Sequence, residues 1–368
     1  MTPPVRVLVV DDSALMRKLI PQILRGNDSI EVVGTAMDGT FGLKKIEELR
    51  PQVITLDLEM PGLSGLDTLR EIRSRHGIPV IVVSSHSTEG ASQTLQALSL
   101  GAFDFVAKPS DVATRMPGIA EELIAKIKAA AHSREIRPAP ELARRSPKIF
   151  SDTQARPTRI LALGISTGGP QALQYLLPQF PADFPAAILI VQHMPEGFTE
   201  QFAQRMDEIC AIRVKEAQSG DVLRAGWALV CPGNRHLKVK RLFQEEIAVL
   251  SDEPHVNGHR PSVDVLFRSV AQECGARSIA LLMTGMGDDG ARAMGDIKAA
   301  GGLTIAQSEE SCVVFGMPKA AIERGHACRV LSLDAVAPAL LAECALDQKK
   351  QTAPSQGLSG LATSIGKS

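Results

Sequence analysis

The sequence predicts an α/β protein made of two doubly wound parallel-sheet domains joined by a linker. Two observations support this prediction. Short β-branched runs alternate with amphipathic helical segments over most of the 368 residues, and such alternation favours parallel sheets with helices on both faces. A stretch rich in Pro, Arg and Ser, without sustained periodicity, interrupts the alternation at residues 132–157. Its composition is typical of a linker.

The first domain is expected over residues 1–131, with five strands. These are VRVLVV (5–10), IEVVGTA (30–36), VITLDL (53–58), PVIVVSS (79–85) and AFDFVAK (102–108). The segments between them are apolar at i, i+3 and i+4 and end in Gly or before Pro, as helices do. In such a sheet, ligands bind beyond the carboxyl ends of the strands.

The second domain is expected over residues 158–347. Its clearest strands are RILALGI, AAILIVQ, ALVCP, EIAVLSD, SIALLMTG and LTIAQS. Residues 348–368 are polar and rich in Gly and Ser, so we expect a disordered tail.

Composition argues against several classes of partner. The net charge is −1, with one Trp and one Tyr, which gives no reason to expect nucleic acid or an anionic membrane. No apolar run approaches the roughly 20 residues needed to span a bilayer. The six cysteines form no CxxC pair, which favours free thiols in a reducing compartment over disulfides or zinc. We therefore expect a soluble cytoplasmic protein without membrane insertion.

Acidic, hydroxyl and basic side chains follow the strands of the first domain. Asp11 and Asp12 follow the first strand, Asp57 ends the third, Ser84 ends the fourth and Lys108 ends the fifth. The carboxylates would converge at one sheet edge, where Mg²⁺ suits carboxylate, water and phosphate oxygens. Together these groups predict a phospho-acceptor site with an aspartyl phosphate as product. Taken alone, the acidic pair could simply cap the following helix.

The motifs VVDDSALMRK, TLDLEMPGLSG, VVSS and FDFVAKP resemble those of a response-regulator receiver domain, over about residues 4–130. The resemblance implies a flavodoxin-like sheet and a histidine kinase as phosphodonor. It also implies the role of each site residue: phosphorylation of Asp57, Mg²⁺ bound by Asp11, Asp12, Asp57 and the backbone carbonyl of Glu59, a switch hydroxyl on Ser84, and phosphate contact by Lys108.

The stretch RILALGISTGGPQAL supplies a strand, a glycine turn and a helix in that order. Within it, Gly164 to Gly168 fit the GxSxG nucleophile elbow, with Ser166 as the candidate nucleophile. The same turn could instead bind an anion at the helix N-terminus. A Walker loop is excluded because no GK[ST] follows.

A serine nucleophile needs a base and an acid that orients the base. His193 follows the strand AAILIVQ, and Asp288 and Asp289 follow SIALLMTG. Each could alone be a capping or helix-terminal group. Together at neighbouring strand ends they predict a triad, and glycine-turn N–H groups could stabilise an oxyanion. The order Ser, His, Asp differs from that of α/β-hydrolases, so we expect a hydrolase on a Rossmann-like sheet.

Residues 158–345 resemble the catalytic domain of the chemotaxis protein-glutamate methylesterases. The matching motifs are GISTGGP, VQHMPEGFTEQFA, CPGNRHL, NGHRPSVDVLF, LLMTGMGDDGA and TIAQSEESCVVFGMPKAAI. The resemblance implies a triad of Ser166, His193 and Asp289. It places Thr167 and Met286 among the supporting or oxyanion groups, Met286 through its backbone N–H. The choice of Asp289 over Asp288 rests on this resemblance.

The family resemblance implies hydrolysis of glutamate γ-methyl esters on chemoreceptor helices and deamidation of selected glutamines. It requires Mg²⁺ only in the receiver domain and no cofactor for ester hydrolysis. The fused domains suggest that the receiver covers the serine until Asp57 is phosphorylated. One rival is a regulator whose second half only binds a phosphate-bearing ligand or protein, and a weaker one is a DNA-binding output. For His259, Arg260 and Asp264, substrate contact and a helix N-terminus remain equally good readings.

Overall fold

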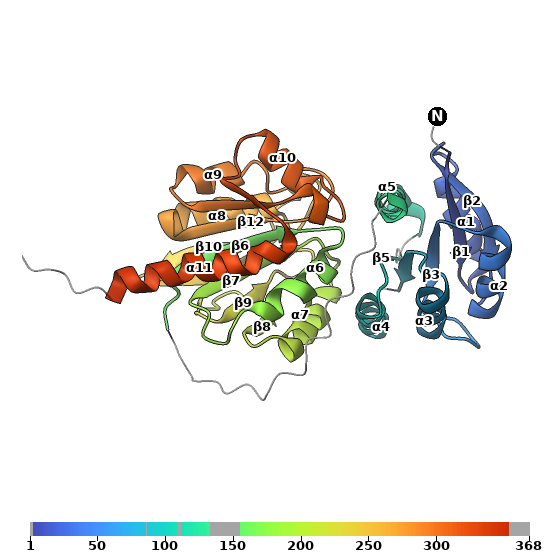
Figure 1. The fold of residues 1–368 in the computed structure, drawn as a ribbon, viewed down its shortest axis with the longest axis horizontal. Coiled ribbons are helices and arrows are strands. Elements are labelled where there is room, and N and C mark those ends of the chain that lie inside the picture. The colour runs from blue at the N-terminus through green and yellow to red at the C-terminus, as the bar shows by residue number, and fades with distance from the viewer. Residues whose placement is uncertain (1–2, 86, 109–111, 133–154, 353–368) are drawn as a thin grey trace, which may run out of the picture.

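The computed structural model describes residues 3–85, 87–108, 112–132 and 155–352. It has two α/β lobes (Figure 1), and the first contains the elements up to α5. Most of the expected linker and residues 353–368 of the expected tail lie outside the described residues.

The first lobe is a parallel five-stranded sheet in the order β2-β1-β3-β4-β5. The strands, close to those predicted, are β1 (Val5–Val10), β2 (Ile30–Ala36), β3 (Val53–Asp57), β4 (Val80–Ser84) and β5 (Asp104–Ala107). The order is that of flavodoxin-like folds. It places β1 beside β3, so the residues that follow these strands meet at one edge.

The helices of the first lobe cover both faces of the sheet. They are α1 (Ala14–Leu24), α2 (Gly39–Leu49), α3 (Gly65–Arg75), α4 (Thr88–Ser99) and α5 (Val112–His132). Val7 and Val9 pack with residues of α1 and α5, whereas Leu8 and Val10 pack with residues of the other three helices. This alternation follows from the two-residue period of a strand and explains why β1 is apolar throughout.

The second lobe contains a parallel seven-stranded sheet in the order β14-β13-β12-β6-β7-β9-β8. Its strands are β6 (Arg159–Ile165), β7 (Ala186–Gln192), β8 (Arg213–Glu216), β9 (Trp227–Val230), β12 (Ser278–Leu282), β13 (Leu303–Gln307) and β14 (Arg329–Leu331). The chain passes from β6 to β7 on one side and later returns to β12 on the other side. Ligand sites in α/β sheets lie at such a change of direction.

The strand expected in EIAVLSD forms, but outside the parallel sheet. It is β11 (Glu245–Ser251), which pairs in antiparallel register with β10 (His236–Leu242) as a separate hairpin. The edge strands β8 and β14 and the strand β10 were not predicted. Charged residues interrupt these segments, for example Arg213 and Lys215 in β8, so they lack a continuous apolar run.

Two groups of helices bury the larger sheet. They are α6 (Gly169–Leu176), α7 (Phe198–Ile209), α8 (Val263–Cys274), α9 (Met294–Ala299), α10 (Met317–Glu323) and α11 (Leu333–Thr352). Residues of α8, α9 and α10 form one core cluster, and residues of α6, α7 and α11 contribute to another. The last helix runs past residue 347, where the domain was expected to end.

Helix α8 packs against the sheet where β6 carries a glycine, Gly164. A Cβ atom on Gly164 would lie 2.2 Å from Val263 Cγ1, at the first residue of α8. Valine is stiff about its χ1 bond and could not easily move aside. Gly164 thus lets the N-terminus of α8 approach the carboxyl end of β6.

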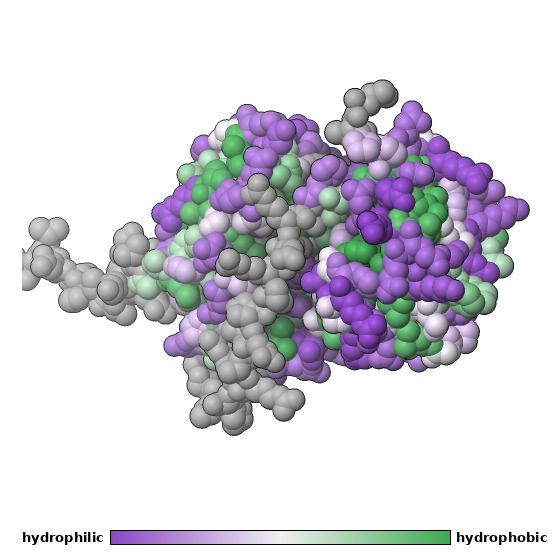
Figure 2. Space-filling view, turned by 45° about the vertical axis from the view of Figure 1, so that its right-hand side comes forward, coloured by the Kyte–Doolittle hydropathy of each residue, from purple (hydrophilic) through white to green (hydrophobic). Residues whose placement is uncertain are grey.

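Hydrophilic residues predominate on the face shown in Figure 2, with hydrophobic residues in smaller groups between them. Among the described residues, no helix is both long and apolar enough to cross a membrane. All six cysteines are free thiols, as expected from their spacing.

Candidate active site and phospho-acceptor site

Ser166 lies on a tightly held turn between β6 and α6. Its backbone N–H donates to Thr284 O at 2.9 Å, and its carbonyl accepts the N–H of Gly169 at 2.8 Å. The Gln192 side-chain amide also donates to the Ser166 carbonyl, at 3.1 Å. Gly168 has φ +76°, a left-handed conformation that favours glycine. The hydroxyl of Ser166 is therefore presented by a backbone fixed on several sides.

His193 directly follows β7, and its imidazole bridges the serine and an acid. Its backbone N–H donates to Ile165 O at 3.1 Å, which holds the residue beside the serine turn. In the ring, Nδ1 lies 3.2 Å from Ser166 Oγ and Nε2 lies 2.9 Å from Asp289 Oδ2. If Nε2 carries the proton that it donates to the carboxylate, Nδ1 is free to accept one from the serine.

Asp289 is buried at the N-terminus of α8. Its carboxylate accepts the backbone N–H groups of Val263 at 2.7 Å and Asp264 at 3.2 Å. Ser262 Oγ donates to it at 2.7 Å and Asn257 Nδ2 at 3.1 Å. A helix N-terminus stabilises negative charge, so this is a prepared site for a carboxylate.

The pKa of Asp289 is held well below its usual range. Burial alone would raise it, but the bond to His193 and the positive charge that ring can carry, followed by the bonds from Val263 and Ser262, outweigh burial. The carboxylate therefore stays ionised and can orient the imidazole by accepting its proton.

The structure separates the two neighbouring acids, which sequence position alone could not do. Asp288 is exposed and forms an ion pair with Arg324 at 2.8 Å. Asp289 is 1% exposed and contacts His193. The acid chosen by resemblance is thus the one placed to act on the histidine.

Thr167 and Met286 lie on the turns that follow the adjacent strands β6 and β12. Thr167 is buried and its carbonyl accepts the hydroxyl of Thr284 at 3.0 Å, whereas the side chain of Met286 is half exposed. Within the part of the chain that the structure describes, neither backbone N–H donates a hydrogen bond. Both are therefore available to an oxyanion on a substrate.

The structure gives His259, Arg260 and Asp264 different surroundings. His259 stacks on the ring of His193. Arg260 donates to Asn234 Oδ1 at 2.6 Å and to the carbonyls of Asp252 and Glu253, bracing two loops. Asp264 is buried and accepts the N–H of Ala293 at 2.9 Å, which is a structural contact.

Asn257 is a site residue that sequence reasoning missed. Its side-chain amide donates to both Asp289 and Asp264, at 3.1 Å and 2.8 Å. The dipeptide Asn257–Gly258 does indicate a tight turn, and both residues have positive φ. Nothing in the sequence indicates that this turn faces the acid.

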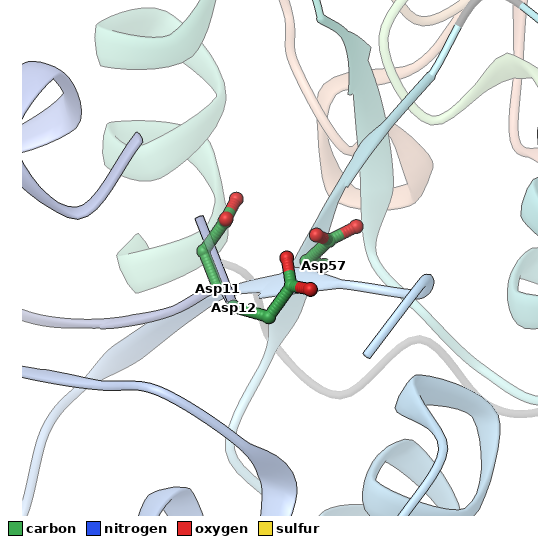
Figure 3. A group of neighbouring side chains, drawn as sticks. All are labelled: Asp11, Asp12 and Asp57. Carbon is green, nitrogen blue, oxygen red and sulfur yellow. The ribbon is translucent and has the colours of Figure 1, made fainter. Parts of the chain in front are cut away.

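The acidic residues of the first lobe meet at the carboxyl edge of its sheet. One carboxylate oxygen of each of Asp11, Asp12 and Asp57 lies within 4.8 Å of the others, and Figure 3 shows the three groups side by side. Lys108 Nζ lies 2.7 Å from Asp57 Oδ2 and 3.3 Å from Asp11 Oδ2. Burial raises the pKa of Asp11 and Asp57, and Lys108 opposes this shift.

This oxygen cluster fits a Mg²⁺ ion. The Oδ2 atom of Asp11 is buried and accepts no hydrogen bond, with only the ammonium of Lys108 beside it at 3.3 Å, and hard cations prefer carboxylate oxygens. A cation would relieve the repulsion between the crowded carboxylates.

Two other predicted residues, Glu59 and Ser84, lie next to this cluster. Glu59 is exposed, and its backbone N–H donates to Asp57 Oδ1 at 3.2 Å. The hydroxyl of Ser84 donates to Gly90 O at 3.1 Å, away from Asp57. Contact between Ser84 and a phosphoryl group on Asp57 would require this hydroxyl to turn.

The receiver lobe contacts the turn that carries the serine. Asp104 Oδ2 accepts the N–H of Gly168 at 3.1 Å, and the Gln171 side chain donates to Ala102 O. Phe105 stacks on Phe198 with ring centroids 5.0 Å apart. Strand β5 therefore contacts the catalytic lobe directly. Helices α4 and α5, which pack on opposite faces of the receiver sheet, both lie beside β5 at the edge nearest the second lobe (Figure 1).

Comparisons with known proteins agree with this two-lobe architecture. The model of the CheB methylesterase family matches residues 161–340, and that of the response regulator receiver domain matches residues 7–116. The protein-glutamate methylesterase/protein-glutamine glutaminase 2 of Koribacter versatilis is 60% identical over 94% of this chain and 97% of its own length. This chain belongs to the CheB methylesterase family.

Other relatives agree. The protein-glutamate methylesterase/protein-glutamine glutaminase of Symbiobacterium thermophilum is 48% identical over 92% of this chain and 96% of its own length. Among solved structures, the crystal structure of the Thermotoga maritima CheB methylesterase catalytic domain shares 39% sequence identity with this chain. It superposes with a TM-score of 0.50 and covers 50% of this chain and 98% of its own. The chain therefore combines a receiver domain with a methylesterase domain.

We predict that Asp289→Asn lowers the stability of the protein by about 1–3 kcal/mol at neutral pH, because an amide leaves buried donors unsatisfied. The folded-state pKa of Asp289 is depressed. Its contribution is therefore fully present above the unfolded pKa of about 3.9 and is lost as pH falls below it. Thermal unfolding of both proteins at decreasing pH should show the difference in midpoint shrinking below about pH 4. Exposed Asp288→Asn is the control, and a pH-independent difference would contradict the prediction.

Proposed function

We propose that this chain is a phosphorylation-regulated serine hydrolase acting on chemoreceptors in chemotactic adaptation. It removes the methyl group from glutamate γ-methyl esters and deamidates selected glutamines. The observation that carries the proposal is the chain of contacts from Ser166 Oγ through His193 to Asp289. The names of the relatives, protein-glutamate methylesterase/protein-glutamine glutaminase, support the substrate class. The proposed place of action is the cytoplasm.

The first half of the reaction forms an acyl-enzyme. Nδ1 of His193 accepts the proton of Ser166 as Oγ attacks the ester carbonyl. Asp289 accepts the hydrogen bond from Nε2, which fixes the tautomer and stabilises the imidazolium. The imidazolium then gives its proton to the leaving methoxy group, and methanol departs.

The tetrahedral intermediates carry a negative oxygen. The N–H groups of Thr167 and Met286 are the proposed donors, since both are unpaired among the described residues and lie on turns next to the serine. Such preorganised donors are typically worth about 3–4 kcal/mol each in the transition state.

The second half of the reaction regenerates the serine. His193 accepts a proton from water, whose oxygen attacks the acyl carbon, and then returns that proton to Ser166 Oγ. The product is the free glutamate side chain. With a glutamine substrate the first half of the reaction releases ammonia in place of methanol, since the protonated leaving group is then an amine. The acyl-enzyme formed is the same, so the second half is unchanged.

The receiver site supplies the regulation. Asp57 is the proposed acceptor. One of its carboxylate oxygens attacks the phosphorus of a phosphohistidine on a histidine kinase, the P–N bond breaks, and the kinase's imidazole leaves. Asp11, Asp12, Asp57 and the carbonyl of Glu59 would hold Mg²⁺, which when bound neutralises charge on the phosphoryl oxygens. Lys108 is already next to Asp57 and would contact the phosphoryl group as a point charge.

The interface explains why phosphorylation would matter. The receiver occupies the side of the serine turn at which Gly168 donates to Asp104. A receptor helix would have to displace the receiver to bring its ester to Ser166. Phosphorylation of Asp57 would favour the open arrangement and so raise the hydrolysis rate.

We predict that methylated receptor membranes release methanol with the wild-type protein. Ser166→Ala should lower the rate by about 10³-fold or more, because it removes the nucleophile. A small-molecule phosphodonor should increase the wild-type rate and leave the variant inactive. If both proteins bind the membranes and neither releases methanol, the second lobe is a binding module and the proposal fails.

We also predict that deleting residues 1 to about 150 raises the basal rate of methanol release, because the receiver no longer covers the serine turn. Rates of the fragment and of the unphosphorylated full chain should be compared at equal concentration. Ser166→Ala in the fragment controls for contaminating esterases. A folded fragment with unchanged or lower activity would refute regulation by occlusion.

A further inference from the structure

We propose that His259 is a positioning residue for the hydrolysis, because its imidazole ring packs flat against that of His193. The two ring centroids are 3.9 Å apart and the ring planes differ by 10°. This inference rests on the proposed function, since it concerns how the base is held for catalysis.

The stack restrains rotation of the His193 ring, which the hydrogen bonds to Ser166 and Asp289 restrain only in part. Rotation of the His193 ring about its Cβ–Cγ bond would move both nitrogens out of line with Ser166 and Asp289. The bond to the serine, at 3.2 Å, is long and resists this rotation little. A second ring lying flat on the imidazole opposes it directly, because the rotating ring would collide with its neighbour.

A tight backbone turn holds His259 in place. The backbone N–H of Val256 donates to His259 O at 3.0 Å, and the N–H of His259 donates back to Val256 O at 2.9 Å. Asn257 and Gly258, between them, have φ of 53° and 77°, as a two-residue hairpin turn of the I′ type requires. The Asn257 side chain anchors the same turn to Asp289. One turn therefore contacts both the acid and the base.

The charge state of His259 suits this role. Burial, followed by the neighbouring charge of His193, lowers its pKa to about 4, with a smaller contribution from His255. Asp289 and Glu122 of α5 act in the opposite direction. His259 is therefore neutral at physiological pH, and a neutral aromatic face can contact the imidazolium formed during the reaction without repelling it.

The geometry separates positioning from proton transfer. Among the described residues, no hydrogen bond joins a ring nitrogen of His259 to Ser166 or to Asp289. The contact with His193 is made through the ring face, so the shape of the side chain should matter more than its nitrogens.

The test measures methanol release from methylated receptor membranes by the full-length protein at several receptor concentrations. His259→Ala should lower kcat by about 10–100-fold and leave KM within about twofold, because a misplaced catalytic group slows chemistry. His259→Phe, which restores a flat ring without nitrogens, should recover kcat to within about threefold of wild type. His255→Ala, an exposed histidine on the same loop, is the matched control and should behave as wild type.

Four outcomes would overturn the proposal. Equal loss of kcat in the Phe and Ala variants would assign the effect to the ring nitrogens. A raised KM with unchanged kcat in both would assign His259 to substrate contact. Wild-type kinetics in the Ala variant would show that His259 has no role in catalysis. If the Ala variant fails to fold, a Phe variant that folds but has a low kcat would still refute the positioning role. Failure of the proposed function is distinct, since the wild type would then match Ser166→Ala.

Discussion

The active site depends on one buried carboxylate at the N-terminus of a helix. Asp289 ends a turn after β12, and α8 presents two backbone N–H groups and the Ser262 hydroxyl to it. Burying a charge is costly unless hydrogen bonds compensate. Because these donors do so, the carboxylate can stay ionised beneath His193. The close approach of α8 to the sheet at Gly164 is what brings the helix end to this point.

The second constraint is that one strand serves both functional sites. Along β5 and the residue after it, Asp104 contacts the serine turn, Phe105 stacks on Phe198, and Lys108 contacts Asp57. Asp104 also forms an ion pair with the buried Lys126 of α5 at 3.2 Å. Lys108, which contacts Asp57, therefore lies only a few residues along the chain from Asp104, which contacts the serine turn.

The parts of the fold that were predictable are those in which burial dictates composition. Strands such as β6 and β7 are buried on both faces, so their apolar runs gave correct bounds. Edge strand β8 carries charges, and β11 shows the same short apolar run whether its partner is parallel or antiparallel. In the site, strand ends indicated Ser166 and His193. The roles of Asn257 and His259 depend on where a distant turn packs, which no local pattern encodes.

The most direct test of the account compares the two adjacent acids in the hydrolysis itself. Rates of methanol release should be measured for Asp289→Asn and Asp288→Asn with methylated receptor membranes. Loss of the group that orients the base should reduce kcat by about 10³–10⁴-fold in Asp289→Asn. Asp288→Asn, which breaks only an exposed ion pair, should remain close to wild type. Similar rates for the two variants, or a larger loss in Asp288→Asn, would contradict the account.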